Sequence, residues 1–162
     1  MEQQADRAAA QVERVSDREL VVTRMVAAPP RLVYRAWSEA DLFRQWWVPA
    51  SFGITLLSCA MDVRTGGTYR LEFGHPASDQ PMAFFGTYLE AVPDEKIVWT
   101  NEESPDGAVT TVTLAAQDGG TLVRISNLFP TREALDAEIE SGATGGLDEQ
   151  FAALDALLAG NA

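Results

Sequence analysis

The sequence predicts an α+β fold, in which a curved antiparallel sheet of about six to seven strands surrounds one long C-terminal helix. Three observations predict it. Apolar and polar residues alternate between tight turns through the middle of the chain, as in antiparallel strands. Two short helical patterns follow the first strand. An apolar stripe with the period of a helix occupies the last residues, and such a stripe can cover one face of a sheet.

The first strand and two helices are predicted near the N-terminus. Residues 18–28, RELVVTRMVAA, form an apolar run typical of a strand. Residues 29–37 begin with two prolines, which suit a helix start, and residues 39–47 form a second short helix that Pro49 ends. The two helices hold three of the four tryptophans: Trp37, Trp46 and Trp47.

The central strands alternate between two faces. Residues 54–63 form a strand, and a glycine turn leads into residues 68–73, TYRLEF, where every second residue is apolar. Residues 74–81 read as a loop. Gly86, inside the next strand, indicates a bulge or a close approach of another chain segment. Four consecutive strands joined by short turns then predict an antiparallel meander at 82–92, 96–101, 108–116 and 121–129.

The C-terminal region is helical from residue 131, with an interruption at 141–146. Its last part carries apolar residues at i, i+4, i+7 and i+11, a single stripe that can pack on the sheet. We therefore expect a single helix-grip domain at 18–160, preceded by a flexible tail at 1–17. The residues of the stripe are Leu147, Phe151, Leu154 and Leu158.

The net charge of −12 argues against a nucleic-acid partner and against anionic membrane surfaces, because both require clustered Lys and Arg. No apolar run approaches the roughly 20 residues of a membrane span, so we expect no membrane insertion. The N-terminus lacks the pattern of a signal peptide, which predicts a cytoplasmic location. Cys59 is the only cysteine, so neither a disulfide nor a cysteine-based metal cluster is expected.

A strongly curved sheet around one helix leaves room for a cavity, and charged residues show which face points outward. Glu90 is taken to point out, which places Phe85 and Thr87 inside; Arg124 points out, which places Ile125 and Asn127 inside. The same residues could instead fill a solid core, and for the tryptophans both alternatives stay open. The predicted ligand-binding residues are Trp47, Leu71, Phe73, Phe85, Thr87, Trp99, Ile125, Asn127, Leu147 and Phe151.

Several segments together resemble a known family. They are VAAPPRLVYRAWSEADLFRQWW, DVRTGGTYRLEF, FFGTYLEAVPDEKIVWTN, TTVTLAAQDGGTLVRISNLF and GGLDEQFAALDALLA, which cover roughly residues 18–160. In their order and spacing these segments resemble the START-like, Bet v 1-like (SRPBCC) superfamily. Within it they are most similar to the bacterial domains that resemble activator of heat-shock-protein-90 ATPase, a branch often labelled polyketide-cyclase-like. The resemblance implies a helix-grip fold that holds hydrophobic or amphipathic ligands. The chain departs from the pattern at Leu147 and Asn127, where relatives often carry Trp and His.

Three functions follow as alternatives. The first is binding of a small apolar or aromatic molecule in the cavity. The second is an enzyme of the cyclase, dehydratase or hydrolase type, with His75 as acid or base beside Asp79 or Glu72, although a surface role in the loop suits His75 as well. The third, suggested by the resemblance alone, is a chaperone partner. Small relatives form dimers, so a homodimer is a further expectation, whereas no metal or cofactor is expected.

Overall fold

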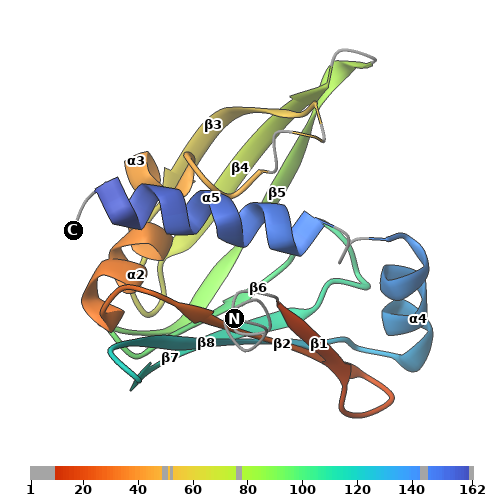
Figure 1. Cartoon of the computed structure of the whole chain (residues 1–162). Coiled ribbons are helices and arrows are strands. Elements are labelled where there is room, and N and C mark those ends of the chain that lie inside the picture. Colours follow the sequence, from red (N-terminus) through yellow and green to blue (C-terminus); the bar gives the residue numbers. More distant parts are fainter. Residues whose placement is uncertain (1–9, 49–50, 52, 76–77, 143–145, 161–162) are drawn as a thin grey trace.

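Eight antiparallel strands form one sheet that curves around the C-terminal helix (Figure 1). The structure is a computed structural model that describes residues 10–48, 51, 53–75, 78–142 and 146–160. The strand order is β1-β2-β8-β7-β6-β5-β4-β3. The strands are β1 (Gln11–Arg14), β2 (Glu19–Val26), β3 (Thr55–Met61), β4 (Thr68–His75), β5 (Ser78–Val92), β6 (Lys96–Thr100), β7 (Val109–Gln117) and β8 (Gly120–Leu128).

Four helices within the described residues cover the concave side and the ends of this sheet. In Figure 1, α5 runs between β3–β5 above it and β1, β2, β7 and β8 below it, while α4 lies at one end and α2 and α3 at the other. The α+β helix-grip fold is therefore confirmed. The helices are α2 (Pro30–Ser38), α3 (Ala40–Phe43), α4 (Arg132–Glu140) and α5 (Leu147–Gly160).

The strand count exceeds the expected six to seven because of β1. This strand lies in the segment that we assigned to an N-terminal tail, and it pairs antiparallel with β2, Gln11 opposite Thr23. All four of its residues are exposed, so it carries no apolar alternation by which a sequence pattern could reveal it. The expected tail residues 1–9 lie outside the described residues.

The β4–β5 hairpin is longer than predicted. Residues 74–81 were expected to form a loop, but β4 continues to His75, which is paired with Ser78 at the start of β5. Pro81 is accommodated within β5, and this strand runs for 15 residues. Its register with β6 is interrupted between Tyr88 and Glu90, which indicates a β-bulge at Leu89.

The core lies between the concave face of the sheet and the helices. The predicted alternation in β4 is confirmed, since Tyr69, Leu71 and Phe73 are all buried. The predicted stripe of α5 is confirmed at Phe151, Leu154 and Leu158, which are buried against the sheet and α2. Leu147, the first residue of the stripe, is half-buried.

Candidate ligand-binding site

An aromatic cavity of about 240 Å³ lies on the concave face of the sheet. Strands β3–β6 form its walls, and α2, α3 and the turn after α3 close one end. Eight of the eleven described lining residues are aromatic, and Asn101 is the one with an amide side chain. We call this space the inner cavity; its lining is Trp37, Phe43, Trp47, Met61, Tyr69, Leu71, Phe73, Phe84, Tyr88, Trp99 and Asn101.

The four tryptophans form a continuous series of ring contacts along this cavity. Trp37 and Trp46 meet edge to face with ring centroids 4.6 Å apart, and Trp46 meets Trp47 at 5.4 Å. Trp47 lies 6.5 Å from Trp99, on β6, and stacks on Phe43 at 4.6 Å. Trp46 is buried in the core, with its Nε1 donating to Ala36 O at 3.0 Å, whereas the other three line the cavity. The cluster is thus partly structural and partly a wall.

A second space of about 510 Å³ adjoins the inner cavity and extends between the sheet, α4 and α5. We call it the outer cavity. It shares five lining residues with the inner one, so the two meet along a common wall. Its remaining lining is more polar and includes Thr110, Asn127 and Gln150. The shared residues are Trp37, Trp47, Phe84, Trp99 and Asn101.

A chain of hydrogen bonds follows this wall from the inner to the outer cavity. The Tyr69 hydroxyl donates to Thr100 O at 2.7 Å and lies 3.3 Å from Asn101 Oδ1. Asn101 Nδ2 donates to Thr110 Oγ1 at 3.2 Å, and this hydroxyl donates to Asn127 Oδ1 at 2.7 Å. Asn127, which was predicted on the inner face, and the other polar groups of this wall therefore have protein partners, which orient them and satisfy their burial.

Tyr69 is held in its neutral form. Burial raises the pKa of its phenol, and the negative charge of nearby Glu103 raises the pKa further. Burial likewise raises the pKa of Tyr88, on the neighbouring strand. Both hydroxyls stay protonated well above neutral pH, so they offer the cavity hydrogen-bonding groups and no charge.

Two buried polar atoms in the cavity walls lack a hydrogen-bond partner among the described residues. One is Trp37 Nε1, on a side chain that is 3% exposed and lines both cavities. The other is Glu103 Oε2, in the wall of the outer cavity. Buried donors and acceptors are normally satisfied, so an unsatisfied pair beside a cavity indicates a place for a polar group of a ligand.

Most of the predicted site residues come together in these two spaces. Leu71 and Phe73 line the inner cavity, Ile125, Asn127 and Leu147 line the outer one, and Trp47 and Trp99 line both. Phe151 is different, because it is fully buried beneath the Arg24 guanidinium, 5.3 Å from its ring centroid. Phe151 packs in the core between α5 and the sheet and is not among the described lining residues of either cavity.

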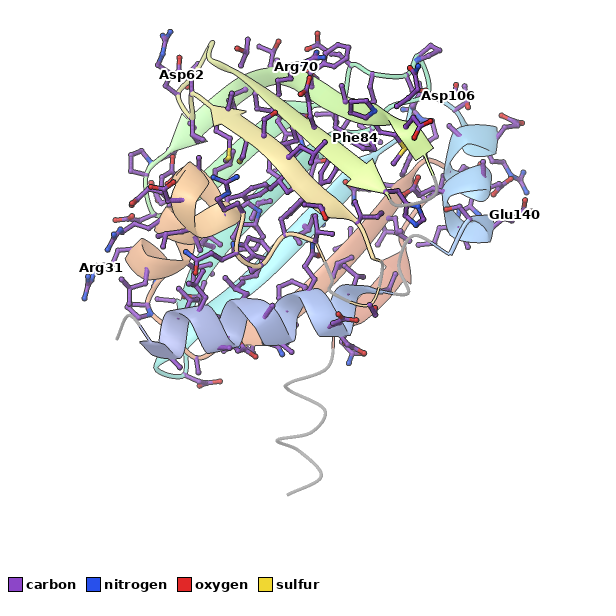
Figure 2. The ribbon with its side chains drawn as sticks, turned by 90° about the horizontal axis from the view of Figure 1, so that it is seen from above. Arg31, Asp62, Arg70, Phe84, Asp106 and Glu140 are labelled. Carbon is purple, nitrogen blue, oxygen red and sulfur yellow. The ribbon has the colours of Figure 1, made fainter. Side chains whose placement is uncertain are left out.

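The prediction that Phe85 and Thr87 point inward is wrong. Phe85 lies on the convex face, where its ring centroid is 5.6 Å from the guanidinium carbon of Arg70. Thr87 Oγ1 donates to the exposed Glu102 at 2.8 Å. Their neighbours Phe84 and Tyr88 face the cavity in their place. Figure 2 shows Arg70 pointing away from the molecule, whereas Phe84 lies toward its middle. The bulge at Leu89 explains the error, because counting alternate residues back from Glu90 crosses it and inverts the face.

Phe84, Tyr88 and Glu103 are among the lining residues that the sequence did not predict. For the first two, the alternation was visible and only its phase was misjudged. Counting from Gly86, where a bulge or a close approach was expected, gives the right face. Glu103 lies in the connection between β6 and β7, where no periodicity assigns a side chain to a face.

His75, the candidate acid or base, lies at the exposed end of β4 and is not among the described lining residues of either cavity. Asp79 is also exposed near this end of the hairpin, and Glu72 contacts Arg70 and Ser58. The three groups are therefore not assembled with the cavity. Within the described residues, no group of three or more His, Cys, Asp or Glu is arranged to hold a metal ion.

A curved sheet around a long helix, with an aromatic cavity between them, defines a START-like helix-grip protein. The chain belongs to the family described as activator of Hsp90 ATPase homolog 1-like protein, whose model matches residues 27–159. This membership supports a ligand-binding domain in general. No curated protein matches the sequence.

Solved structures share the fold. A Rhodobacter sphaeroides protein superposes with a TM-score of 0.86 at 23% identity, over 94% of this chain and 99% of the other. A Chromobacterium violaceum protein is 33% identical, with a TM-score of 0.72 over 86% and 96% of the two chains. An AHSA1-like protein from Aeromonas hydrophila gives a TM-score of 0.70 at 19% identity, over 85% and 92%. None of the described helices is long and apolar enough to cross a membrane.

Proposed function

We propose that this protein binds a small hydrophobic or aromatic molecule in the inner cavity. The observation that carries the proposal is the aromatic lining of a cavity of about 240 Å³ that adjoins a larger, more polar one. Small-molecule sites are typically apolar concavities with a few convergent polar groups. Here Asn101 and Tyr69 provide such groups, and their hydrogen bonds hold them in fixed orientations.

The aromatic walls make association with a planar ring favourable. Edge-to-face and stacked contacts between rings each contribute about 0.5–1.5 kcal/mol beyond the burial of apolar area. A ring that enters between Trp47, Trp99 and Phe84 can form several such contacts. These three side chains lie in the wall that both cavities share, so a ligand can contact them from either side.

Phe84 and Phe85 offer a matched pair of variants for the test. They are neighbours on β5 with nearly equal exposure, 37% and 36%, yet only Phe84 lines the cavities. Both F84A and F85A should lower the free energy of unfolding by a similar amount, about 1–2 kcal/mol, below the 3–5 kcal/mol typical of a fully buried Phe. Only F84A should weaken binding of the ligand.

The ligand is first identified by native mass spectrometry of freshly purified protein, with extraction of any retained small molecule and thermal-shift screening of aromatic compounds. Isothermal titration of the wild type, F84A and F85A then measures affinity. Loss of affinity in F84A alone supports the proposal. Equal affinity in the wild type and both variants contradicts the proposal. A bare protein mass with no thermal shift from any compound also contradicts it.

The family description motivates a second candidate function, stimulation of a chaperone ATPase. Its test is the ATPase rate of a purified bacterial Hsp90-type chaperone with increasing amounts of this protein. A rate that rises to saturation supports a chaperone partner, and an unchanged rate at excess protein removes that function. The cavity variants F84A and F85A show in the same assay whether stimulation depends on the cavity.

A further inference from the structure

The polar end of the site has a marked charge bias. Glu103, Asp106 and Glu138 line the outer cavity, and none of the described lining residues is Lys, Arg or His. Figure 2 shows Asp106 beside α4, the helix that carries Glu138. Three carboxylates around one space create a negative potential, which attracts cations and repels anions.

Glu103 provides a specific contact within this bias. Its Oε2 atom is buried and has no donor among the described residues. A buried acceptor without a donor is destabilising, and the cost is larger if the acceptor is charged. A ligand group that donates a hydrogen bond to this oxygen removes that cost, so binding of such a group is selectively favoured.

Trp37 provides an independent indication of a ligand. Its Nε1–H is buried without an acceptor among the described residues, although the equivalent group of Trp46 is bonded to Ala36 O. A tryptophan N–H normally finds a partner when it is buried. Because Trp37 lines both cavities, an acceptor atom between the ring and the polar end of a ligand would be suitably placed to accept from it.

The aromatic wall reinforces the same charge preference. Trp47, Trp99 and Phe84 lie where the two cavities meet. The faces of aromatic rings attract cations, and this attraction becomes stronger when the cation is desolvated. An ammonium group at this junction would therefore be attracted by the rings as well as by the carboxylates.

We propose that the ligand is an aromatic amine: its ring system occupies the inner cavity, an oxygen near the ring accepts from Trp37 Nε1, and its protonated nitrogen lies in the outer cavity and donates to Glu103. This inference rests on the proposed function and specifies the class of ligand. Molecules with the same ring and a carboxylate in place of the amine should bind more weakly, because the carboxylates of the outer cavity repel them.

Three probes with one ring system and one ether oxygen test the charge preference: naphthyloxyethylamine, naphthyloxyethanol and naphthyloxyacetate. Isothermal titration at low salt should show the amine binding at least about tenfold more tightly than the acetate, with the alcohol between them. One ion pair in a partly desolvated site accounts for a factor of this size. A tighter or equal affinity for the acetate overturns the inference but leaves the proposed function standing. If none of the three probes binds, the inference fails, and the proposed function then depends on the mass-spectrometry and thermal-shift screen described above.

Neighbouring glutamates provide the matched control. Glu103→Gln should reduce the amine-to-acetate ratio severalfold or more. Glu102→Gln should leave it unchanged, because the Glu102 side chain lies outside the cavity lining and accepts from Thr87 and Thr100. Trp37→Phe keeps the ring and should lower affinity for all three probes alike, since each carries the ether oxygen. Thermal unfolding of each variant verifies folding, and an unchanged ratio in folded Glu103→Gln overturns the assignment of Glu103.

Discussion

Gly86 lies where β5 passes close to Thr100, the last residue of β6. A Cβ atom at this position would lie 2.0 Å from Thr100 O, well inside van der Waals contact. The same carbonyl accepts the Tyr69 hydroxyl, and the Thr100 hydroxyl accepts from Thr87 N at 2.9 Å. Because Gly86 has no side chain, β5 can pair closely with β6, and Thr100 O is in place to accept from the Tyr69 hydroxyl of the cavity.

Gly86→Ala should lower the free energy of unfolding by about 2–4 kcal/mol, because the backbone must shift to relieve the clash. Chemical denaturation measures the loss. Gly160→Ala is the control: a Cβ there meets nothing within 4 Å, so Ala at this helix end should be neutral or slightly stabilising. Equal stability of G86A and wild type would show that the sheet relaxes without cost.

For individual residues, the alternation of apolar and charged side chains predicted which positions line the cavity only where the strands are regular. It placed Leu71 and Phe73 correctly on β4, since charged Arg70 and Glu72 mark the opposite face. It failed at Phe85 and Thr87 on β5, because a bulge inverts the alternation and leaves no distinct sequence signal. Strand phase is thus predictable from local charge patterns only within an uninterrupted ladder.

The contact between β2 and α5 depends on a buried cation. Arg24 is 5% exposed, on a strand whose neighbouring inward positions are aliphatic. Its Nη1 lies 2.8 Å from Asp155 Oδ2 and donates to Met25 O at 2.9 Å, while the guanidinium covers the ring of Phe151. The sequence stripe of α5 predicted the apolar half of this contact, but nothing in the sequence indicated the ion pair.

Asp155→Asn should lower the free energy of unfolding by about 1–3 kcal/mol, because it removes the charged partner of a buried guanidinium. Urea denaturation, together with amide exchange of α5, measures the effect. Glu39→Gln is the control: it removes an ion pair with Arg35 that is shorter, at 2.6 Å, but lies on the surface. Exposed pairs contribute little, so this change should cost under about 0.5 kcal/mol. The reverse order of the two losses would contradict the importance of burial.

For the elements as a whole, apolar periodicity predicted most of the fold and missed β1. The stripe of α5 and the helix α2 follow directly from their spacing, whereas α3 ends at Phe43, so the helix predicted over 39–47 is shorter than expected and Trp46 and Trp47 lie in the turn after it. β1 has four exposed residues and is held by backbone pairing with β2. Elements that bury no side chains have no hydrophobic pattern, so sequence reasoning cannot detect them.

The whole molecule combines a curved sheet, a single gripping helix and a strong negative charge. With 24 acidic and 12 basic side chains, mutual repulsion opposes the compact state at low ionic strength. The same excess of negative charge includes the carboxylates of the outer cavity. Salt should therefore act on stability and on ligand binding in opposite directions.

Raising sodium chloride from about 10 mM to about 150 mM shortens the Debye length from about 30 Å to about 8 Å. Because repulsion among the carboxylates is then screened, Tm should rise by a few degrees, measured by calorimetry. The affinity for naphthyloxyethylamine should fall over the same range, since its attraction to Glu103 and its neighbours is partly screened, whereas naphthyloxyethanol should bind equally well throughout. A Tm that falls with salt would show that ion pairs such as Arg24–Asp155 outweigh the net repulsion. An amine affinity independent of salt would show that the ligand is held by its ring alone, and that the carboxylates of the outer cavity have no part in its selection.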